Sequence, residues 1–169
     1  MRRWQFLLIA FIAGLALAAA LNAAPPLHRA SGGGTVIFEG IGTEAYGFNA
    51  KLTAAGEVKG QGEFHFVVPV VNFHAEMNCL AVDGDTAWLG MEVTRTDDPD
   101  TIPVGFDWTW QIRDNGEGAG APPDQQSFFF PTAQLRDFGF DADDCNDMPP
   151  LFDFPDGVFD WTNGNLQVR

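Results

Sequence analysis

The sequence predicts an all-β protein: an antiparallel up-and-down barrel of about eight strands with a long ordered C-terminal loop. Apolar and polar residues alternate along several segments, which is typical of strands that bury one face. Outside the N-terminus, no window of helical length keeps the i, i+3, i+4, i+7 apolar spacing of an amphipathic helix. Consecutive strands joined by hairpin turns favour an up-and-down barrel over a sandwich, and the last strand would close it by pairing with the first.

The first three strands follow from apolar runs between turn signals. Thr35–Phe38 is a β-branched run preceded by three glycines. Tyr46–Leu52 alternates strictly between apolar and polar residues. After a turn at Gly56, the segment 58–68 returns with its phenylalanines in phase, and Pro69 ends it or marks an edge.

Three further strands occupy the middle of the chain. In 73–82, one face is expected to carry Phe73, Ala75, Met77 and Cys79. The turn Asp83-Gly84-Asp85 joins it to a hairpin partner at 87–94. In 104–112 both indoles fall on one face, which makes this the clearest strand in the chain.

The C-terminal part begins with a seventh strand at 126–130 and then loses periodicity from 131 to 163. Six large aromatic residues in that segment make it too apolar for a disordered tail, so we expect an ordered loop held over one end of the barrel. Thr162-Asn163-Gly164-Asn165 predicts a turn before a last short strand at 166–169.

The N-terminus is typical of an export signal. Arg2 and Arg3 precede a mostly apolar, uncharged run, Phe6–Leu21, which is too short for a spanning helix and is followed by small residues. We therefore expect a secreted or periplasmic protein with no membrane attachment after signal removal. The expected division is a cleaved signal peptide at 1–24, a linker at 25–33 and a single barrel domain at 34–169.

The charge of the mature chain limits its partners. The chain has 23 acidic and nine basic residues, and loss of Arg2 and Arg3 leaves seven basic residues and a net charge of −16. Nucleic acid and anionic membranes need clusters of lysine and arginine, which the sequence lacks. The sequence predicts neither partner.

Cys79 and Cys145 are the only cysteines. In an exported chain an even pair favours a disulfide over two free thiols. Closing a loop of about 67 residues would stabilise the fold by about 4 kcal/mol in the chain-entropy model. The alternatives, a catalytic thiol or a metal-bound pair, lack a partner nucleophile or a CxxC spacing.

Most of the mature chain resembles a group of small secreted bacterial proteins of unassigned function. The segments that carry the resemblance are Gly34, Gly47-Phe48-Asn49-Ala50, Gly56-Glu57-Val58-Lys59-Gly60, Cys79-Leu80-Ala81-Val82, Ala87-Trp88, Gln111-Ile112-Arg113-Asp114-Asn115-Gly116-Glu117-Gly118, Pro123-Asp124 and Asp144-Cys145. The resemblance implies export and a compact β fold, lipocalin-like or allene-oxide-cyclase-like. It implies no active site.

One candidate metal site lies on the predicted hairpin around Pro69. A four-residue connection would place His65 opposite His74 and Glu63 opposite Glu76, so that two imidazoles and two carboxylates share one patch. Such a set suits zinc. The alternative is that these residues form the solvated face of an amphipathic hairpin.

Two acidic loops are candidate calcium sites. Asp141, Asp143, Asp144 and Asp147 crowd around Cys145, and a second cluster comprises Asp114, Asn115, Glu117 and Asp124. The first run lacks the glycine and the final glutamate of an EF-hand loop. In so acidic a chain, solvated or turn-forming side chains are the alternative.

The aromatic residues allow two interpretations, a ligand cavity or a filled core, and a filled core is the commoner outcome. The interior of an eight-stranded barrel is just wide enough for one small molecule, and the candidate lining residues are Trp88, Trp108, Trp110, Phe128 and Phe130. Our first hypothesis is a non-enzymatic module that binds a small apolar ligand or a protein partner and needs no cofactor. The alternative is a barrel enzyme, a cyclase, isomerase or metal-assisted hydrolase, that uses the His/Glu patch.

Overall fold

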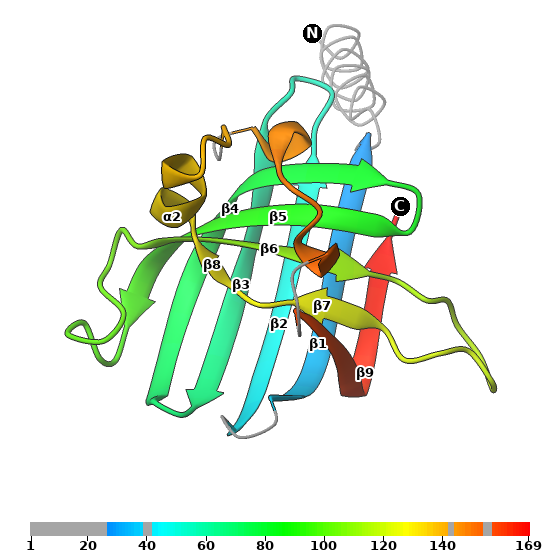
Figure 1. Ribbon diagram of the computed structural model, residues 1–169, viewed down its shortest axis with the longest axis horizontal. Coiled ribbons are helices and arrows are strands. Elements are labelled where there is room, and N and C mark those ends of the chain that lie inside the picture. Colours follow the sequence, from blue (N-terminus) through cyan, green and yellow to red (C-terminus); the bar gives the residue numbers. More distant parts are fainter. Residues whose placement is uncertain (1–26, 39–41, 142–143, 154–156) are drawn as a thin grey trace, which may run out of the picture.

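The computed structural model describes residues 27–38, 42–141, 144–153 and 157–169, and the proposed signal peptide lies outside them. The described chain forms a closed eight-stranded antiparallel barrel, as predicted (Figure 1). Its elements are β1 (His28–Phe38), β2 (Gly42–Leu52), β3 (Val58–Val67), β4 (Val70–Asp83), β5 (Thr86–Thr96), β6 (Asp107–Arg113), β7 (Gln125–Ser127), the short β8 (Phe130–Pro131), helix α2 (Thr132–Asp137), the 3-10 turns η1 (Cys145–Asp147) and η2 (Leu151–Asp153), and β9 (Val158–Val168).

The strands follow one another around the barrel in chain order. Each strand from β1 to β5 pairs with the next, β5 pairs with β6, β6 with β7, and β7 with β9. The predicted closure between the first and last strands is confirmed, because β9 pairs with β1 from Ala30 to Val36. The short β8 adds to β6 alone among the described strands.

The first and last strands are both longer than the sequence indicated. β1 begins at His28, within the range 25–33 expected as a linker, and β9 begins at Val158, so the expected turn 162–165 lies inside a strand. Close approach of the two backbones explains the glycines. A Cβ added at Gly34 would lie 2.1 Å from the carbonyl oxygen of Asn163 and 2.7 Å from the ring of Trp161. The glycines therefore permit strand pairing here and do not interrupt it.

A bulge in β4 reverses the side-chain alternation. The register against β5 shifts between Met77 and Cys79, so Met77 points into the core while Leu80 and not Cys79 continues the inward series. The prediction that Cys79 shares the face of Phe73 and Met77 is therefore wrong. Opposite the bulge is Gly90, where an added Cβ would lie 2.7 Å from the Cβ of Cys79.

Aromatic rings fill the barrel interior. Phe64 and Phe73 stack with their ring centroids 4.8 Å apart, and both side chains are fully buried. Phe38, Phe128 and Phe159 form a second group, with Phe159 4.4 Å from Phe38 and 4.3 Å from Phe128. Burial of these rings is the main apolar contribution to stability.

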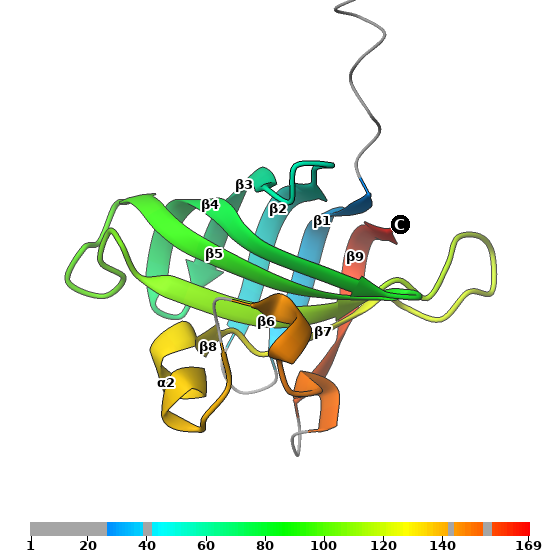
Figure 2. The same ribbon diagram turned by 90° about the horizontal axis from the view of Figure 1, so that it is seen from above.

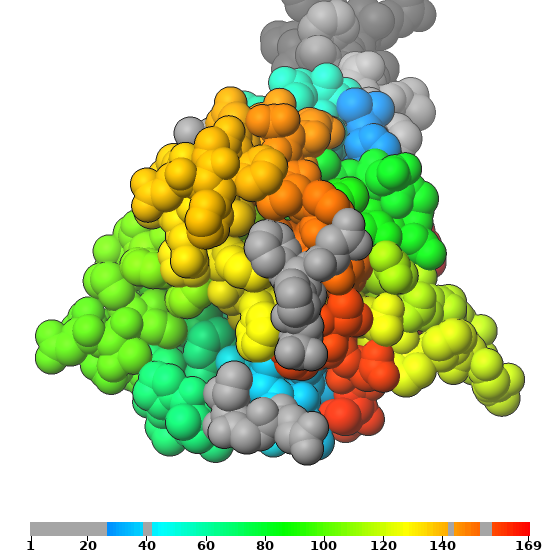
Figure 3. Space-filling view, in the orientation of Figure 1, coloured from blue at the N-terminus to red at the C-terminus, as the bar shows by residue number. Residues whose placement is uncertain are grey.

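The ordered C-terminal segment lies on the outer wall of the barrel, not over one of its ends. In Figures 1 and 2 the segment from α2 to η2 lies outside β4, β5 and β6, and Figure 3 shows it covering that face. We call residues 132–153 the outer cover. Its apolar anchors are Leu135, Met148 and Leu151, which pack with the outward-facing Trp88 of β5. Of the six aromatics on which its order was predicted, Phe138 is 62% exposed, Phe159 and Trp161 belong to β9, and Phe154 lies outside the described residues.

The predicted disulfide joins the outer cover to the barrel. Cys79 of β4 is bonded to Cys145 of η1, and both pack against Trp88. Beneath the cover, the hydroxyl groups of Thr109 and Thr132 lie 3.1 Å apart, and the amide of Phe152 donates to Oε1 of Gln111. The outer cover buries these polar residues on the outer face of β6, and the two bonds satisfy them.

Replacing both cysteines by alanine should lower the free energy of unfolding by up to about 4 kcal/mol, because the bond closes a long loop. The measurement is urea denaturation of the double variant beside the wild type. Free-thiol labelling of both cysteines in the unreduced, denatured wild type would contradict the bond.

Leu151→Ala should cost about 2 to 5 kcal/mol of stability, because Leu151 is fully buried and anchors the cover. Phe138→Ala is the control, since this exposed ring should contribute no more than about 0.5 kcal/mol. Denaturation and limited proteolysis provide the readout. Equal effects of the two substitutions would show that Leu151 is not an anchor.

Candidate functional site

The inward face of β2 carries two polar side chains into the barrel. Tyr46, Phe48 and Ala50 point inward, and the alternation places Glu44 on the same face, between Val36 of β1 and Phe66 of β3. Tyr46 is 5% exposed and packs edge-on against Trp161 at a centroid distance of 5.1 Å. A carboxyl and a phenol therefore enter the interior from this wall.

Polar groups also enter from the opposite wall. Trp108 and Trp110 of β6 pack against the core, and Trp110 is fully buried. Gln126 of β7 is also fully buried, and its Oε1 accepts a hydrogen bond of 3.1 Å from Nε1 of Trp161. Its amide nitrogen has no such partner among the residues that the structure describes.

Five buried side-chain atoms have no hydrogen-bond partner among the described residues. They are Glu44 Oε2, Tyr46 Oη, Trp108 Nε1, Trp110 Nε1 and Gln126 Nε2. All five belong to the inward-facing side chains just described. We call this group the interior polar set. Native proteins leave few such groups without a partner, because each one costs about 1 to 3 kcal/mol.

Phe129 lies beside three of these side chains. Its ring centroid is 5.2 Å from Trp110, 5.6 Å from Tyr46 and 6.3 Å from Trp108. Phe129 lies between β7 and β8, where the strand is interrupted, and both it and Phe128 pack against the core. In a continuous strand, two successive side chains would point to opposite faces. The interruption therefore allows both rings to face the interior.

Burial changes the acid–base properties of the two β2 groups. It raises the pKa of Glu44 from its usual 4.5 to about 8, which leaves the carboxyl largely protonated at pH 7. Burial also raises the pKa of Tyr46 well above its usual value, and the nearby Glu44 adds to this effect. Both groups are therefore neutral hydrogen-bonding groups at neutral pH.

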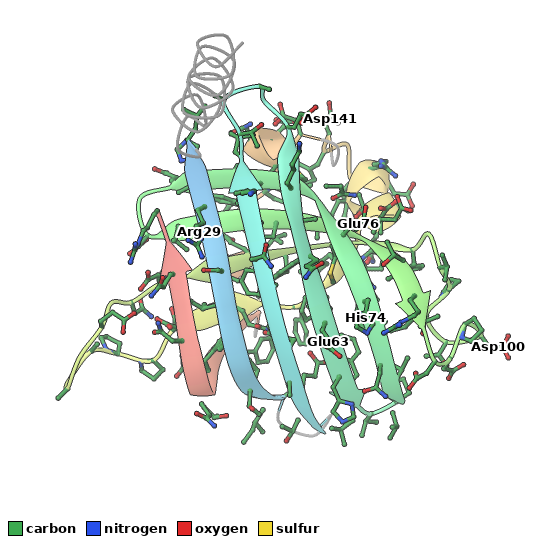
Figure 4. The ribbon with its side chains drawn as sticks, turned by 180° about the vertical axis from the view of Figure 1, so that it is seen from behind. Arg29, Glu63, His74, Glu76, Asp100 and Asp141 are labelled. Carbon is green, nitrogen blue, oxygen red and sulfur yellow. A yellow bond between two sulfur atoms is a disulfide. The ribbon has the colours of Figure 1, made fainter. Side chains whose placement is uncertain are left out.

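The predicted metal patch lies on the outer face, and its expected register is wrong. A two-residue connection, Val68-Pro69, shifts the hairpin so that Glu63 pairs with His74, and His65 with Asn72. In Figure 4, Glu63, His74 and Glu76 lie on the outside of β3 and β4. The His74 ring lies 3.6 Å from Glu63 and also contacts Arg95. This patch borders an open depression of about 590 Å³.

The other histidine of the patch takes part in a separate network. His65 contacts the side chain of Asn72, whose Nδ2 donates to Asp97 over 2.6 Å. Hydrogen bonds from Asn72 lower the pKa of Asp97. Within the described ranges, no three His, Cys, Asp or Glu side chains come together as metal ligands. Zinc binding stays a prediction.

The acidic loop around Asp114 and Asp124 completes the barrel wall. Asp124 is 7% exposed, and its carboxylate accepts hydrogen bonds from the amides of Leu166 and Asn115, at 2.6 and 2.9 Å. Asp114 accepts from the amide of Val168 at 3.1 Å. Because β7 reaches β9 only at residues 158–160, these carboxylates act as acceptors for β9 where the neighbouring strand is missing.

The loop around Cys145 also uses its acids locally. Asp144 caps η1 by accepting from the amide of Asn146, and this bond lowers the pKa of Asp144. The amide of Asp141 donates to the carboxylate of Asp147 over 3.3 Å. Asp143 lies outside the described residues. Calcium binding by this loop stays a prediction.

The predicted cavity residues separate into two groups. Trp108, Trp110 and Phe128 pack with the interior core. Trp88 and Phe130 lie outside it with the outer cover, and Nε1 of Trp88 donates to the carbonyl of Pro149 over 3.0 Å. Sequence reasoning missed Glu44, Tyr46, Gln126 and Phe129. Glu44 could have been found, because it continues the alternation of Tyr46 and Phe48 by one step.

Comparisons with protein-family models, curated proteins and solved structures find no match to this chain. The described residues also contain no helix that is long and apolar enough to span a membrane. The interior polar set is therefore the strongest evidence on function that the chain itself offers.

Glu44→Gln should remove a pH dependence of stability. Because the folded-state pKa of Glu44 is raised to about 8, its contribution is fully present below about pH 4.5 and is lost as the pH rises through 8. The glutamine variant should match the wild type near pH 5 and exceed its stability near pH 9 by up to about 4 kcal/mol.

Urea denaturation at pH 5, 7 and 9 measures this difference. Glu76→Gln is the matched control, since this glutamate is exposed on the outer face of β4. If the wild type and Glu44→Gln lose stability equally as the pH rises, Glu44 is not buried in the way described.

Proposed function

We propose that this protein is a non-enzymatic, exported β-barrel protein that binds one small, largely apolar molecule inside the barrel. The observation that carries the proposal is the interior polar set, five buried atoms that lack a partner among the described residues. Aromatic rings surround these atoms, and such a mixture of apolar walls and few polar groups is typical of small-molecule sites.

The energetic argument concerns the cost of the unmatched groups. Five unsatisfied atoms at about 1 to 3 kcal/mol each would consume much of the net stability of a domain, which is about 5 to 15 kcal/mol. A bound molecule that supplies hydrogen bonds removes this cost and stabilises the folded state by mass action. Ordered water that satisfies the same atoms is the competing explanation. It requires that each buried water molecule find two or more polar partners.

The location of the two kinds of polar group favours binding over catalysis. The imidazole and carboxylate groups of the enzyme hypothesis, Glu63 and His74 among them, lie on an open outer surface where water competes for every hydrogen bond. The interior set comprises neutral donors and a protonated acid, which recognise a ligand without requiring a nucleophile. Export remains part of the proposal and agrees with the Cys79–Cys145 bond.

Native mass spectrometry of protein purified from its own host is the test. We expect a complex heavier than the mature chain, with the extra mass lost under denaturing conditions. Tyr46→Phe should weaken retention of the small molecule, whereas Trp88→Phe, which removes an indole outside the barrel, should not. A spectrum that contains only the protein mass, together with ordered water on the interior polar set in a high-resolution crystal structure, would refute the proposal.

A further inference from the structure

The interior polar set is rich in hydrogen-bond donors. Trp108 Nε1, Trp110 Nε1 and Gln126 Nε2 can only donate, and the oxygen of the Gln126 amide already accepts from Trp161. The Tyr46 hydroxyl can donate as well. A molecule that satisfies these groups must therefore present an oxygen that accepts hydrogen bonds.

The charges around the barrel interior favour a ligand whose acceptor oxygen belongs to a neutral group. The described lysine and arginine residues lie on the outside of the barrel, and the partly buried one, Arg113, sits 4.6 Å above the ring of Phe152 in the outer cover. An anionic ligand would be buried without a cation and close to Glu44, at a large desolvation cost. The mature net charge of −16 opposes its approach as well. A carbonyl oxygen meets both requirements, because it accepts two hydrogen bonds and carries no charge.

Phe129 is held less firmly than the other rings beside the interior polar set. The ring belongs to the interruption between β7 and β8, so its backbone forms no sheet pairing, whereas Tyr46, Trp108 and Trp110 are carried by paired strands. Phe129 is also only partly buried, unlike the fully buried Trp110. Its displacement would leave a space the size of one aromatic ring, bordered by Tyr46 and the two indoles.

We propose that the barrel binds a neutral carbonyl compound of about one ring in size, which displaces the side chain of Phe129 and accepts hydrogen bonds from two of the three donors Tyr46, Trp108 and Trp110. This inference rests on the proposed function and adds the ligand class and the entry route. It requires no covalent step.

Three probes of nearly the same shape test the ligand class by isothermal titration calorimetry. Acetophenone carries a carbonyl, α-methylstyrene replaces its oxygen by a methylene group, and benzoate carries a negative charge. The mature wild type should bind acetophenone at least about tenfold more tightly than α-methylstyrene, because only the ketone offers these donors an acceptor. Benzoate should bind most weakly.

Two kinds of variant test the residues. Phe129→Ala, or the milder Phe129→Leu, should tighten binding of both neutral probes, since the ring no longer has to move. Trp110→Phe and Tyr46→Phe should reduce the preference for acetophenone over α-methylstyrene while leaving α-methylstyrene binding nearly unchanged. Phe138→Ala and Trp88→Phe are the controls, because these aromatic residues lie outside the barrel.

Each outcome distinguishes the two proposals. Equal affinity for acetophenone and α-methylstyrene would overturn the carbonyl assignment and leave interior binding intact, and tightest binding of benzoate would overturn the neutral assignment. Unchanged affinity in both Phe129 variants would overturn the entry route. No binding of any probe by the wild type or by either Phe129 variant would overturn the ligand class, and the proposed interior function would fall with it only if native mass spectrometry also showed the protein mass alone.

Discussion

The close pairing of β1 with β9 is the contact on which the rest of the structure depends. Gly34 faces the backbone of Asn163 and the indole of Trp161 so closely that any side chain there would overlap them. This contact joins the two ends of the sheet, and closure removes the exposed edges that an open sheet would present. It also encloses the inward faces of all the strands. Without it, Glu44 and Tyr46 would be solvated and the interior polar set would not exist.

The outer wall depends on a second local irregularity. The bulge between Met77 and Cys79 turns Cys79 outward, and Gly90 makes room for it on the neighbouring strand. Only in this orientation can Cys79 reach Cys145 and hold the outer cover against β4, β5 and β6. The cover in turn buries the polar outer face of β6, where Gln111 and Thr109 find partners in η2 and α2. One extra residue in a strand thus determines which wall of the barrel is covered.

The interior and the acidic loops use polar groups in opposite ways. Asp114 and Asp124 are satisfied by backbone amides of β9, so their charge serves the barrel wall. The interior polar set is unsatisfied within the described chain, and three of its members, Tyr46, Trp108 and Trp110, lie beside Phe129, a ring on an unpaired backbone segment. Full satisfaction is typical of a structural role, whereas unsatisfied groups beside a ring on an unpaired segment support the proposed ligand site. This contrast locates the proposed function inside the barrel.

Period-two alternation determined the strands and the barrel, because it depends only on which residues are apolar and on the geometry of an extended chain. The same pattern, extended by one step, contained Glu44. The cysteine pair was also evident, since two cysteines permit a single intramolecular bond. Only the tertiary structure decided the register of Glu63 and His74, which a two-residue change in the turn moves along the strand. It also decided the continuation of β1 and β9 through their glycines, the bulge at Cys79 and the inward turn of Phe129. Each of these features depends either on the backbone of a partner strand or on an interruption of strand pairing. The local run of residues encodes neither of these two conditions.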